Sequence, residues 1–229
     1  MGHALYFSPD TFGFLGELRA NNNRDWFLAN RARYESVVRD PFLQFIADLA
    51  PRLERISPHL VADPRPSGGS FIRIFRDTRF SKDKSPYKWH AAAHFRHVKG
   101  KDIHAPGFYL HLEPRQVFAA NGLWHPDPPT LARIREAIVA SPARWERALS
   151  NKPFKSQWTL EGEKLKRPPA GYDPSHPLIE DLKRKDFISS LPFTEAQACA
   201  DDFLDRFVDS CQAASPFIQF LTRAVGLEW

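Results

Sequence analysis

The sequence has few cysteines, no long apolar run and few glycines, and each shortage excludes a class of protein. Only two of its 229 residues are cysteines, Cys199 and Cys211. Both fall in a stretch that we expect to be one helix, in which their Cα atoms would lie about 18 Å apart, too far for a disulfide. Neither has a cysteine or histidine neighbour at the spacing of a metal-binding motif. We therefore interpret both as small apolar residues of a protein from the reducing cytoplasm.

No apolar run approaches the ~20 residues of a membrane-spanning helix, and the first residues lack a secretory pattern, so we expect no membrane partner. The 20 prolines outnumber the 11 glycines, which favours fixed turns and helix starts over flexible linkers. Hydrophobic residues make up 42% of the chain and aromatic residues 13%. This content excludes general disorder. We predict one domain that spans residues 1–229.

The positive charge is concentrated in one segment. Residues 70–101 contain nine lysines and arginines but only two aspartates, whereas the net charge of the whole chain is +5. The rest of the chain is therefore slightly acidic. Such a distribution indicates a local anion-binding surface rather than a uniformly basic coat.

Helix-start signals, in which a serine or aspartate precedes a proline, open apolar patterns of helical spacing on both sides of the middle third. They occur at Ser8-Pro9, Asp40-Pro41, Asp127-Pro128, Ser141-Pro142 and Ser215-Pro216. We expect further helices from Arg24 and from Thr194, where Gln197 completes a capping box. Residues 151–175 are expected to form an irregular connection.

The middle of the chain favours short strands because of its β-branched and aromatic content. The expected strands cover residues 71–76, 91–98, 107–113 and 115–121. Tight turns between them favour antiparallel pairing, since parallel pairing would need long crossovers. The sequence therefore predicts an α+β fold in which a central antiparallel β-sheet, a meander, is packed by N- and C-terminal helices.

The densest set of candidate ligand-binding residues follows the first expected strand. Arginine forks bind phosphate or carboxylate groups, and lysine adds a mobile charge. We predict that a ligand is bound by Arg73, Arg76, Arg79, Lys84, Tyr87 and Lys88. Two alternatives stay open, since Asp77 and Asp83 can pair with these cations and order the loop without a ligand, or the loop can serve as a partner surface.

This segment resembles a family of conserved hypothetical proteins from bacteria and fungi. The family is marked by the signature Arg-Asp-x-Arg-Phe-Ser-x-Asp-Lys-x-Pro-Tyr-Lys, which matches residues 76–88 here. Further matches lie at 22–27, 106–110, 124–126 and 165–172, so the resemblance spans residues 7–220. The chain departs from the family at Trp89, where threonine is usual, and at Asn121, where the first of two glycines is usual. The resemblance implies an α+β domain of a bacterial protein and no established activity.

Histidines form a second group of candidates. His90, His94, His97, His104 and His111 lie within 22 residues. Tyr109, His111 and Glu113 share one face of an expected strand and are the candidate catalytic residues, since a His–Glu pair can act as acid and base or bind a metal ion. No compact metal-binding pattern accompanies them, so we expect no metal ion and no other cofactor. Arg73 would join them if its strand lies in the same sheet; the alternative is a salt-bridged sheet face.

These observations predict a cytoplasmic domain that binds a phosphate- or carboxylate-bearing ligand, and they leave open whether it is an enzyme. A Gly-rich phosphate loop and a nucleophile elbow are absent from the sequence, which argues against the common nucleotide-binding and hydrolase classes. One alternative is a nucleic-acid binder, because Phe75, Phe80, Tyr87 and Trp89 are interleaved with the cations. The other is a protein-interaction module without a small ligand.

Overall fold

The computed structural model describes residues 5–100 and 105–229, so the predicted positions Lys101 and His104 lie outside it. At its centre is a five-stranded antiparallel sheet with the strand order β1-β2-β3-β5-β4. The strands are β1 (Ala91–Arg96), β2 (Gly107–Glu113), β3 (Gln116–Leu123), β4 (Thr159–Glu161) and β5 (Phe187–Phe193). The predicted α+β fold is confirmed, and β1, β2 and β3 form the predicted meander.

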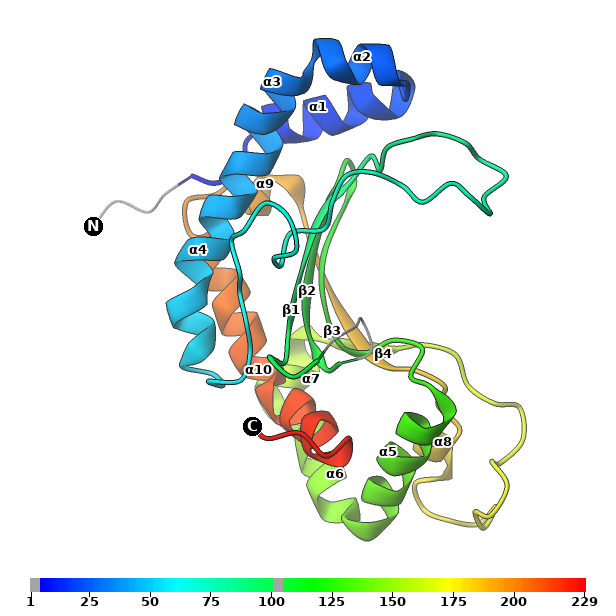
Figure 1. Ribbon diagram of the computed structural model, residues 1–229. Helices are drawn as coiled ribbons and strands as arrows, with labels where there is room; N and C mark the ends of the chain where they lie inside the picture. The colour runs from blue at the N-terminus through cyan, green and yellow to red at the C-terminus, as the bar shows by residue number, and fades with distance from the viewer. Residues whose placement is uncertain (1–4, 101–104) are drawn as a thin grey trace.

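Helices precede and follow the meander (Figure 1). Before it come α1 (Pro9–Ala20), α2 (Arg24–Ala29), α3 (Arg31–Tyr34), the π-helical turn η1 (Glu35–Arg39) and α4 (Asp40–Glu54). After it come α5 (Pro128–Ala140), α6 (Pro142–Ser150), α7 (Lys152–Gln157), α8 (Ile179–Leu182), α9 (Glu195–Ala198) and α10 (Phe203–Ala224). Within the described chain, no helix combines the length and apolar character that crossing a membrane requires.

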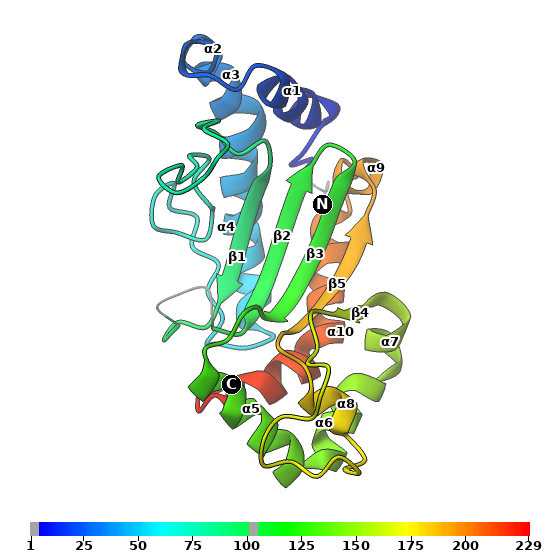
Figure 2. The same ribbon diagram turned by 90° about the vertical axis from the view of Figure 1, so that its right-hand side faces the viewer.

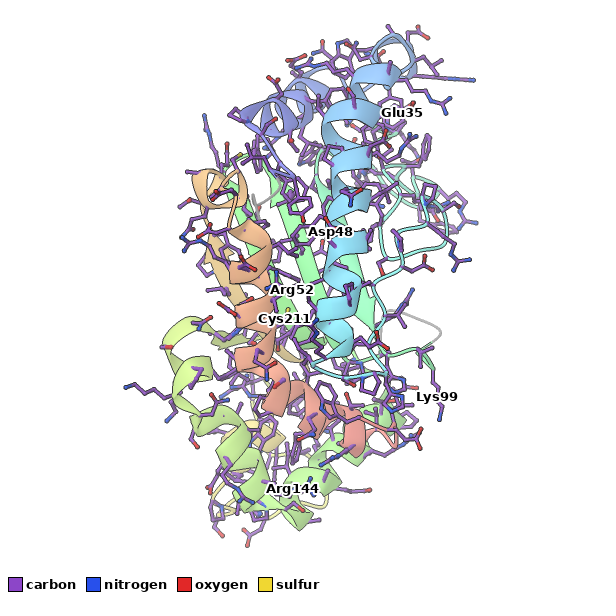
Figure 3. The ribbon with its side chains drawn as sticks, turned by 90° about the vertical axis from the view of Figure 1, so that its left-hand side faces the viewer. Glu35, Asp48, Arg52, Lys99, Arg144 and Cys211 are labelled. Carbon is purple, nitrogen blue, oxygen red and sulfur yellow. The ribbon has the colours of Figure 1, made fainter. Side chains whose placement is uncertain are left out.

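Two long helices, α4 and α10, lie side by side against one face of the sheet (Figures 1 and 3). Their aromatic residues interlock there: the ring of Phe207 on α10 lies 5.7 Å from Phe45 on α4 and 5.8 Å from Phe95 on β1. At the outer surface, Arg52 of α4 pairs with Asp205 of α10 at 2.5 Å. This side of the sheet holds much of the apolar core.

The opposite face of β1, β2 and β3 is left uncovered by the helices of the described residues (Figure 2). At one end of this face, the segment between β1 and the preceding helices projects beyond the sheet, and α5 and α8 lie at the other end (Figure 1). Because side chains alternate along a strand, residues that do not enter the core point to this open face. The fold therefore presents the polar side of β2 on this open face.

The expected strand over residues 71–76 is wrong as a continuous strand. Phe71 forms an isolated bridge with Ala93 of β1, and Phe75 forms one with Tyr87. After its short contact with β1, the chain turns outward and pairs with its own returning segment. We call residues 73–88 the basic hairpin. The backbone N–H of Arg76 donates to the carbonyl of Pro86 at 2.9 Å inside it.

The basic hairpin is fixed to the N-terminal helices. The Asn22 side chain accepts from the backbone N–H of Tyr87 at 3.1 Å and donates to the Tyr87 carbonyl at 2.9 Å. The Tyr87 ring stacks on Phe27 of α2 with 4.1 Å between ring centroids. These contacts orient the hairpin relative to the sheet.

Several parts of the second half of the chain differ from the sequence expectations. The expected irregular connection over residues 151–175 contains α7 and β4. The helix expected from Thr194 is the short α9, with the predicted capping box, and α10 starts separately, so Cys199 and Cys211 do not share a helix. The helix start expected at Ser215-Pro216 is wrong, because α10 continues through Pro216. The Ser215 hydroxyl donates to the Gln212 carbonyl at 2.8 Å, which satisfies the oxygen that Pro216 cannot reach.

Candidate functional site

Three polar residues of β2 form a hydrogen-bonded chain on the open face. Tyr109 Oη lies 3.0 Å from His111 Nδ1, and His111 Nε2 lies 3.2 Å from Glu113 Oε2. With its proton on Nε2, the His111 ring donates to Glu113 and accepts from the Tyr109 hydroxyl, so both ring nitrogens have partners. The three residues share a face as predicted from strand alternation. We call them the Tyr–His–Glu chain.

A tryptophan and two arginines surround the carboxylate end of this chain. The Trp89 indole N–H donates to Glu113 Oε1 at 3.1 Å, and Arg19 of α1 lies 3.8 Å from the same oxygen. The guanidinium carbons of Arg19 and Arg76 lie 5.5 and 5.6 Å from the Trp89 ring centroid. Two cations from distant parts of the sequence therefore converge on one indole beside Glu113.

A second histidine lies against the first. The ring centroids of His90 and His111 are 4.5 Å apart, and the Phe118 ring also stacks on His111, at 4.7 Å. Burial, followed by the neighbouring His111, lowers the pKa of His90 to about 4. Burial also lowers the pKa of His111 against the opposing effect of Glu113. Both imidazoles are therefore neutral near pH 7 and able to accept a proton or bind an ion.

A cavity of about 470 Å³ opens next to Tyr109. Its walls include Ile72, His94, Tyr109, Phe118, Trp124 and Ile188. Most of these side chains are apolar or aromatic, while Tyr109 and His94 supply polar atoms. Burial raises the pKa of the Tyr109 hydroxyl, so this group stays protonated near pH 7, and its oxygen can accept a hydrogen bond from a ligand. A cavity of this size and lining suits the body of a small organic ligand.

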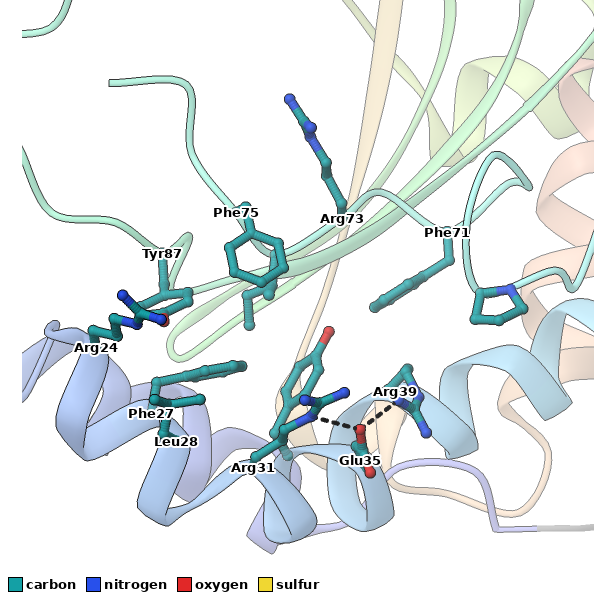
Figure 4. Close-up of a pocket in the computed structure, with 13 residues that line it drawn as sticks. Arg24, Phe27, Leu28, Arg31, Glu35, Arg39, Phe71, Arg73, Phe75 and Tyr87 are labelled. Atoms are coloured by element: carbon teal, nitrogen blue, oxygen red, sulfur yellow. Dashed lines mark hydrogen bonds and ion pairs between the residues drawn. The ribbon is translucent and has the colours of Figure 1, made fainter. Parts of the chain in front are cut away.

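A separate cavity of about 370 Å³ lies between the N-terminal helices and the basic hairpin (Figure 4). In it, Glu35 binds Arg31 at 3.1 Å and Arg39 at 2.7 Å. Arg73 also lines this cavity, but its side chain extends away from the ion-paired group in Figure 4. Pairing with β1 is limited to an isolated bridge at Phe71, so Arg73 is not carried on a strand of the sheet, and its expected approach to the Tyr–His–Glu chain stays a prediction.

The other predicted ligand-binding residues make contacts within the hairpin or with α2. Arg76 pairs with Asp83, Arg79 pairs with Asp77 at 2.6 Å, Lys84 donates to the Thr78 carbonyl at 2.9 Å and Lys88 donates to the Arg73 carbonyl at 2.7 Å. Tyr87 is only 4% exposed. Of this set, the structure brings Arg76 close to Trp89, which donates to Glu113 of the Tyr–His–Glu chain. Ligand binding by the set stays a prediction.

Sequence reasoning did not select Arg19, Trp89 or His90 for the site. The sequence did mark Trp89 as unusual, because the family that the chain resembles usually has threonine at this position. His90 was among the counted histidines, but nothing in the sequence placed it against His111. Arg19 lies 94 residues before Glu113 in the chain, so only the tertiary fold brings it there.

A family model described as a conserved hypothetical protein (DUF2461) matches residues 10–220, which covers most of the chain and confirms the family resemblance. No curated protein and no solved structure matches the chain.

Proposed function

We propose that this chain, which belongs to the DUF2461 family of conserved hypothetical proteins, binds a small ligand that carries a phosphate or carboxylate group. The proposed position is the open face of the sheet, beside the Tyr–His–Glu chain. One observation carries the proposal: Arg19 and Arg76 converge on Trp89 directly next to this chain.

The charge and exposure of the two arginines support an anionic ligand. Arg19 is open to solvent, with 62% of its side chain exposed and a distance of 3.8 Å to its nearest Glu113 oxygen. A guanidinium in this state can turn its fork toward a phosphate or carboxylate. Arg76 is less exposed, at 22%, and its pairing with Asp83 holds it in place. Arg19 is therefore the better candidate for direct contact, and Arg76 adds positive potential.

The neighbouring cavity supports a ligand with an apolar part and a group that exchanges a proton. Tyr109 lies at the cavity wall and at the head of the Tyr–His–Glu chain. If the ligand gives a proton to the Tyr109 oxygen, the Tyr109 proton can pass to His111 Nδ1, and the Glu113 carboxylate stabilises the imidazolium that forms. We limit the proposed function to binding, and Tyr109, His111 and Glu113 stay candidate catalytic residues.

Thermal unfolding with inorganic pyrophosphate, phosphate and citrate, at matched ionic strength, tests the proposal. An anion present at 100 times its dissociation constant stabilises the fold by about 2.7 kcal/mol, which raises the Tm by several degrees. We expect this shift to be lost in Arg19→Gln. Arg31→Gln is the matched control, because Arg31 is similarly exposed, at 64%, but lines the other cavity.

Two results would contradict the proposal. One is that no anion raises the Tm of the wild-type protein. The other is that Arg19→Gln responds like the wild type while Arg31→Gln does not, which would move the ligand to the cavity beside the N-terminal helices.

The tip of the basic hairpin favours nucleic-acid binding as a second candidate function. Phe80 is 96% exposed there, and the Arg79 guanidinium lies 5.8 Å from its ring centroid. An exposed ring between cations can stack on a base while the cations contact phosphates. Binding of single-stranded DNA should then fall steeply with salt and weaken in Phe80→Ala. An affinity that does not change with salt would remove this candidate.

We also propose that the protein works in a reducing bacterial cytoplasm. Both cysteines are free thiols, and Cys211 is buried inside α10. Free thiols of this kind are typical of proteins that are not exposed to an oxidising compartment.

A further inference from the structure

We propose that His90, His111 and Glu113 bind a divalent transition-metal ion such as Zn²⁺ on the open face of the sheet. Each of the three offers one ligand atom, and these atoms lie within 4.8 Å of one another. The sheet register explains the grouping. Ala91 pairs with Leu112, so the next position along places His90 opposite Glu113 and diagonal to His111.

The spacing of the His111–Glu113 pair fits a shared metal ion. Two ligands that each lie about 2.1 Å from a tetrahedral Zn²⁺ are about 3.4 Å apart. His111 Nε2 and Glu113 Oε2 are 3.2 Å apart. The third ligand needs little movement, because the rings of His90 and His111 lie 4.5 Å apart and are inclined by 32°. The His90 ligand atom lies within 4.8 Å of the other two, so it has to move by about 1 Å to reach the spacing of a shared ion.

The residues behind these ligands hold them in the orientation that binding requires. Tyr109 Oη contacts His111 Nδ1 at 3.0 Å, which leaves Nε2 to face Glu113. Trp89 donates to Glu113 Oε1 at 3.1 Å, which leaves Oε2 to face His111. Such outer partners fix the ring and the carboxylate of a metal site. When the ion binds, His111 changes tautomer, so that Nε2 gives up its proton and Nδ1 gains one and donates to Tyr109 Oη, while the hydroxyl hydrogen of Tyr109 turns toward the cavity.

The set of ligand atoms favours Zn²⁺ and similar ions over Mg²⁺ or Ca²⁺. Two imidazole nitrogens and one carboxylate oxygen suit first-row transition metals, whereas Mg²⁺ and Ca²⁺ prefer oxygen alone. Three protein ligands leave a position for a water molecule or a ligand oxygen, as in catalytic zinc sites. An anion bound near Arg19 can fill that position. This last step rests on the proposed function, whereas metal binding itself does not.

Metal binding is measured on the full chain after treatment with a chelator. Zn²⁺ binding is followed by equilibrium dialysis with elemental analysis, and Co²⁺ binding by its visible absorption, which reports tetrahedral coordination. We expect one equivalent of either ion, an increase in Tm, and an affinity at least ~10-fold lower in His90→Gln and Glu113→Gln. Circular dichroism confirms that each variant is folded.

His125→Asn is the matched control. His125 lies 3.1 Å from Asp186, so it forms another His–carboxylate pair, but it is not part of the three-residue group. We expect this variant to bind the ion like the wild type. The proposal is overturned if folded wild-type protein binds neither ion at micromolar concentration, or if His125→Asn weakens binding as much as His90→Gln does.

Arg19→Gln separates this inference from the proposed function. The variant should keep metal binding, because Arg19 approaches Glu113 Oε1 rather than the oxygen that faces His111, and it should lose anion binding. If the wild-type protein binds the metal ion but no anion raises its Tm, the proposed metal site is supported and only the proposed function is contradicted. If an anion raises the Tm but no metal ion binds, the proposed function is supported and only the metal site is contradicted.

Discussion

Trp89 shows, at the scale of single residues, how much of the candidate site depends on contacts that alternation cannot predict. Strand alternation predicted that Tyr109, His111 and Glu113 share a face, since that rule needs only the spacing along β2. Trp89 lies outside any strand, yet its N–H binds Glu113 and its ring lies near Arg19 and Arg76. Such contacts join separate segments, so a single sequence does not show them.

His94 gives a prediction for the pH dependence of stability. Burial, followed by the neighbouring charge of Arg96, lowers the pKa of His94 to about 4 from the ordinary 6.5. Between these values the unfolded chain binds a proton that the folded chain does not, so the free energy of unfolding falls as the pH falls from about 6.5 to about 4. His90 contributes in the same direction.

Urea unfolding at several pH values measures this effect. We expect the wild-type protein to lose stability over this range and His94→Gln to lose less of it, because one of the histidines with a lowered pKa is removed. If the free energy of unfolding falls equally with pH in the two proteins, His94 is solvated in the folded state. That result would contradict the burial to which we attribute its low pKa.

At the scale of elements, prediction from the sequence was most accurate where two independent rules agreed. The expected strands at 91–98, 107–113 and 115–121 correspond to β1, β2 and β3, because alternation and tight turns agree there. β5 was missed, since two serines and Pro192 interrupt its apolar pattern. Pro192 is tolerated because β4 pairs only with residues 188–190, so the outer side of β5 needs no N–H at residue 192.

Gly122 is the one glycine that this chain keeps of the two that are usual in the family at this point of β3, and the structure shows why it is needed. Its φ angle is +113°, and a Cβ atom at this position would lie 2.0 Å from the Phe187 carbonyl oxygen of β5. Gly122→Ala should therefore lower the free energy of unfolding by roughly 3 kcal/mol or more. Denaturant unfolding measures the loss.

Gly13→Ala is the opposite case and serves as the control. Gly13 lies in α1, and a Cβ atom there would have no neighbour within 4 Å. Alanine favours the helix more than glycine does, so we expect a gain of up to about 1 kcal/mol. If both variants lose stability equally, the close approach of β3 and β5 is not what makes Gly122 necessary.

At the scale of the whole molecule, the site exists because one face of the sheet is packed by α4 and α10 while the other stays open (Figures 1 and 2). The α+β class followed from the order of helix and strand patterns. The sequence did not predict which face of the sheet the helices would cover. Both faces of β2 carry aromatic residues, Phe108 on one side and Tyr109 on the other. Packing of the whole chain decides this, and it also brings α1 and the basic hairpin to the same end of the sheet.

The indole N–H of Trp89 is the most direct reporter of ligand binding at this open face. In an NMR titration of the ¹⁵N-labelled protein with pyrophosphate, its signal, assigned through Trp89→Phe, should shift and saturate. The signal of Trp158 should stay fixed, because its N–H is buried and donates to the Ser210 carbonyl at 3.1 Å. A titration in which pyrophosphate binds but the Trp89 signal does not move would contradict the proposed position of the site.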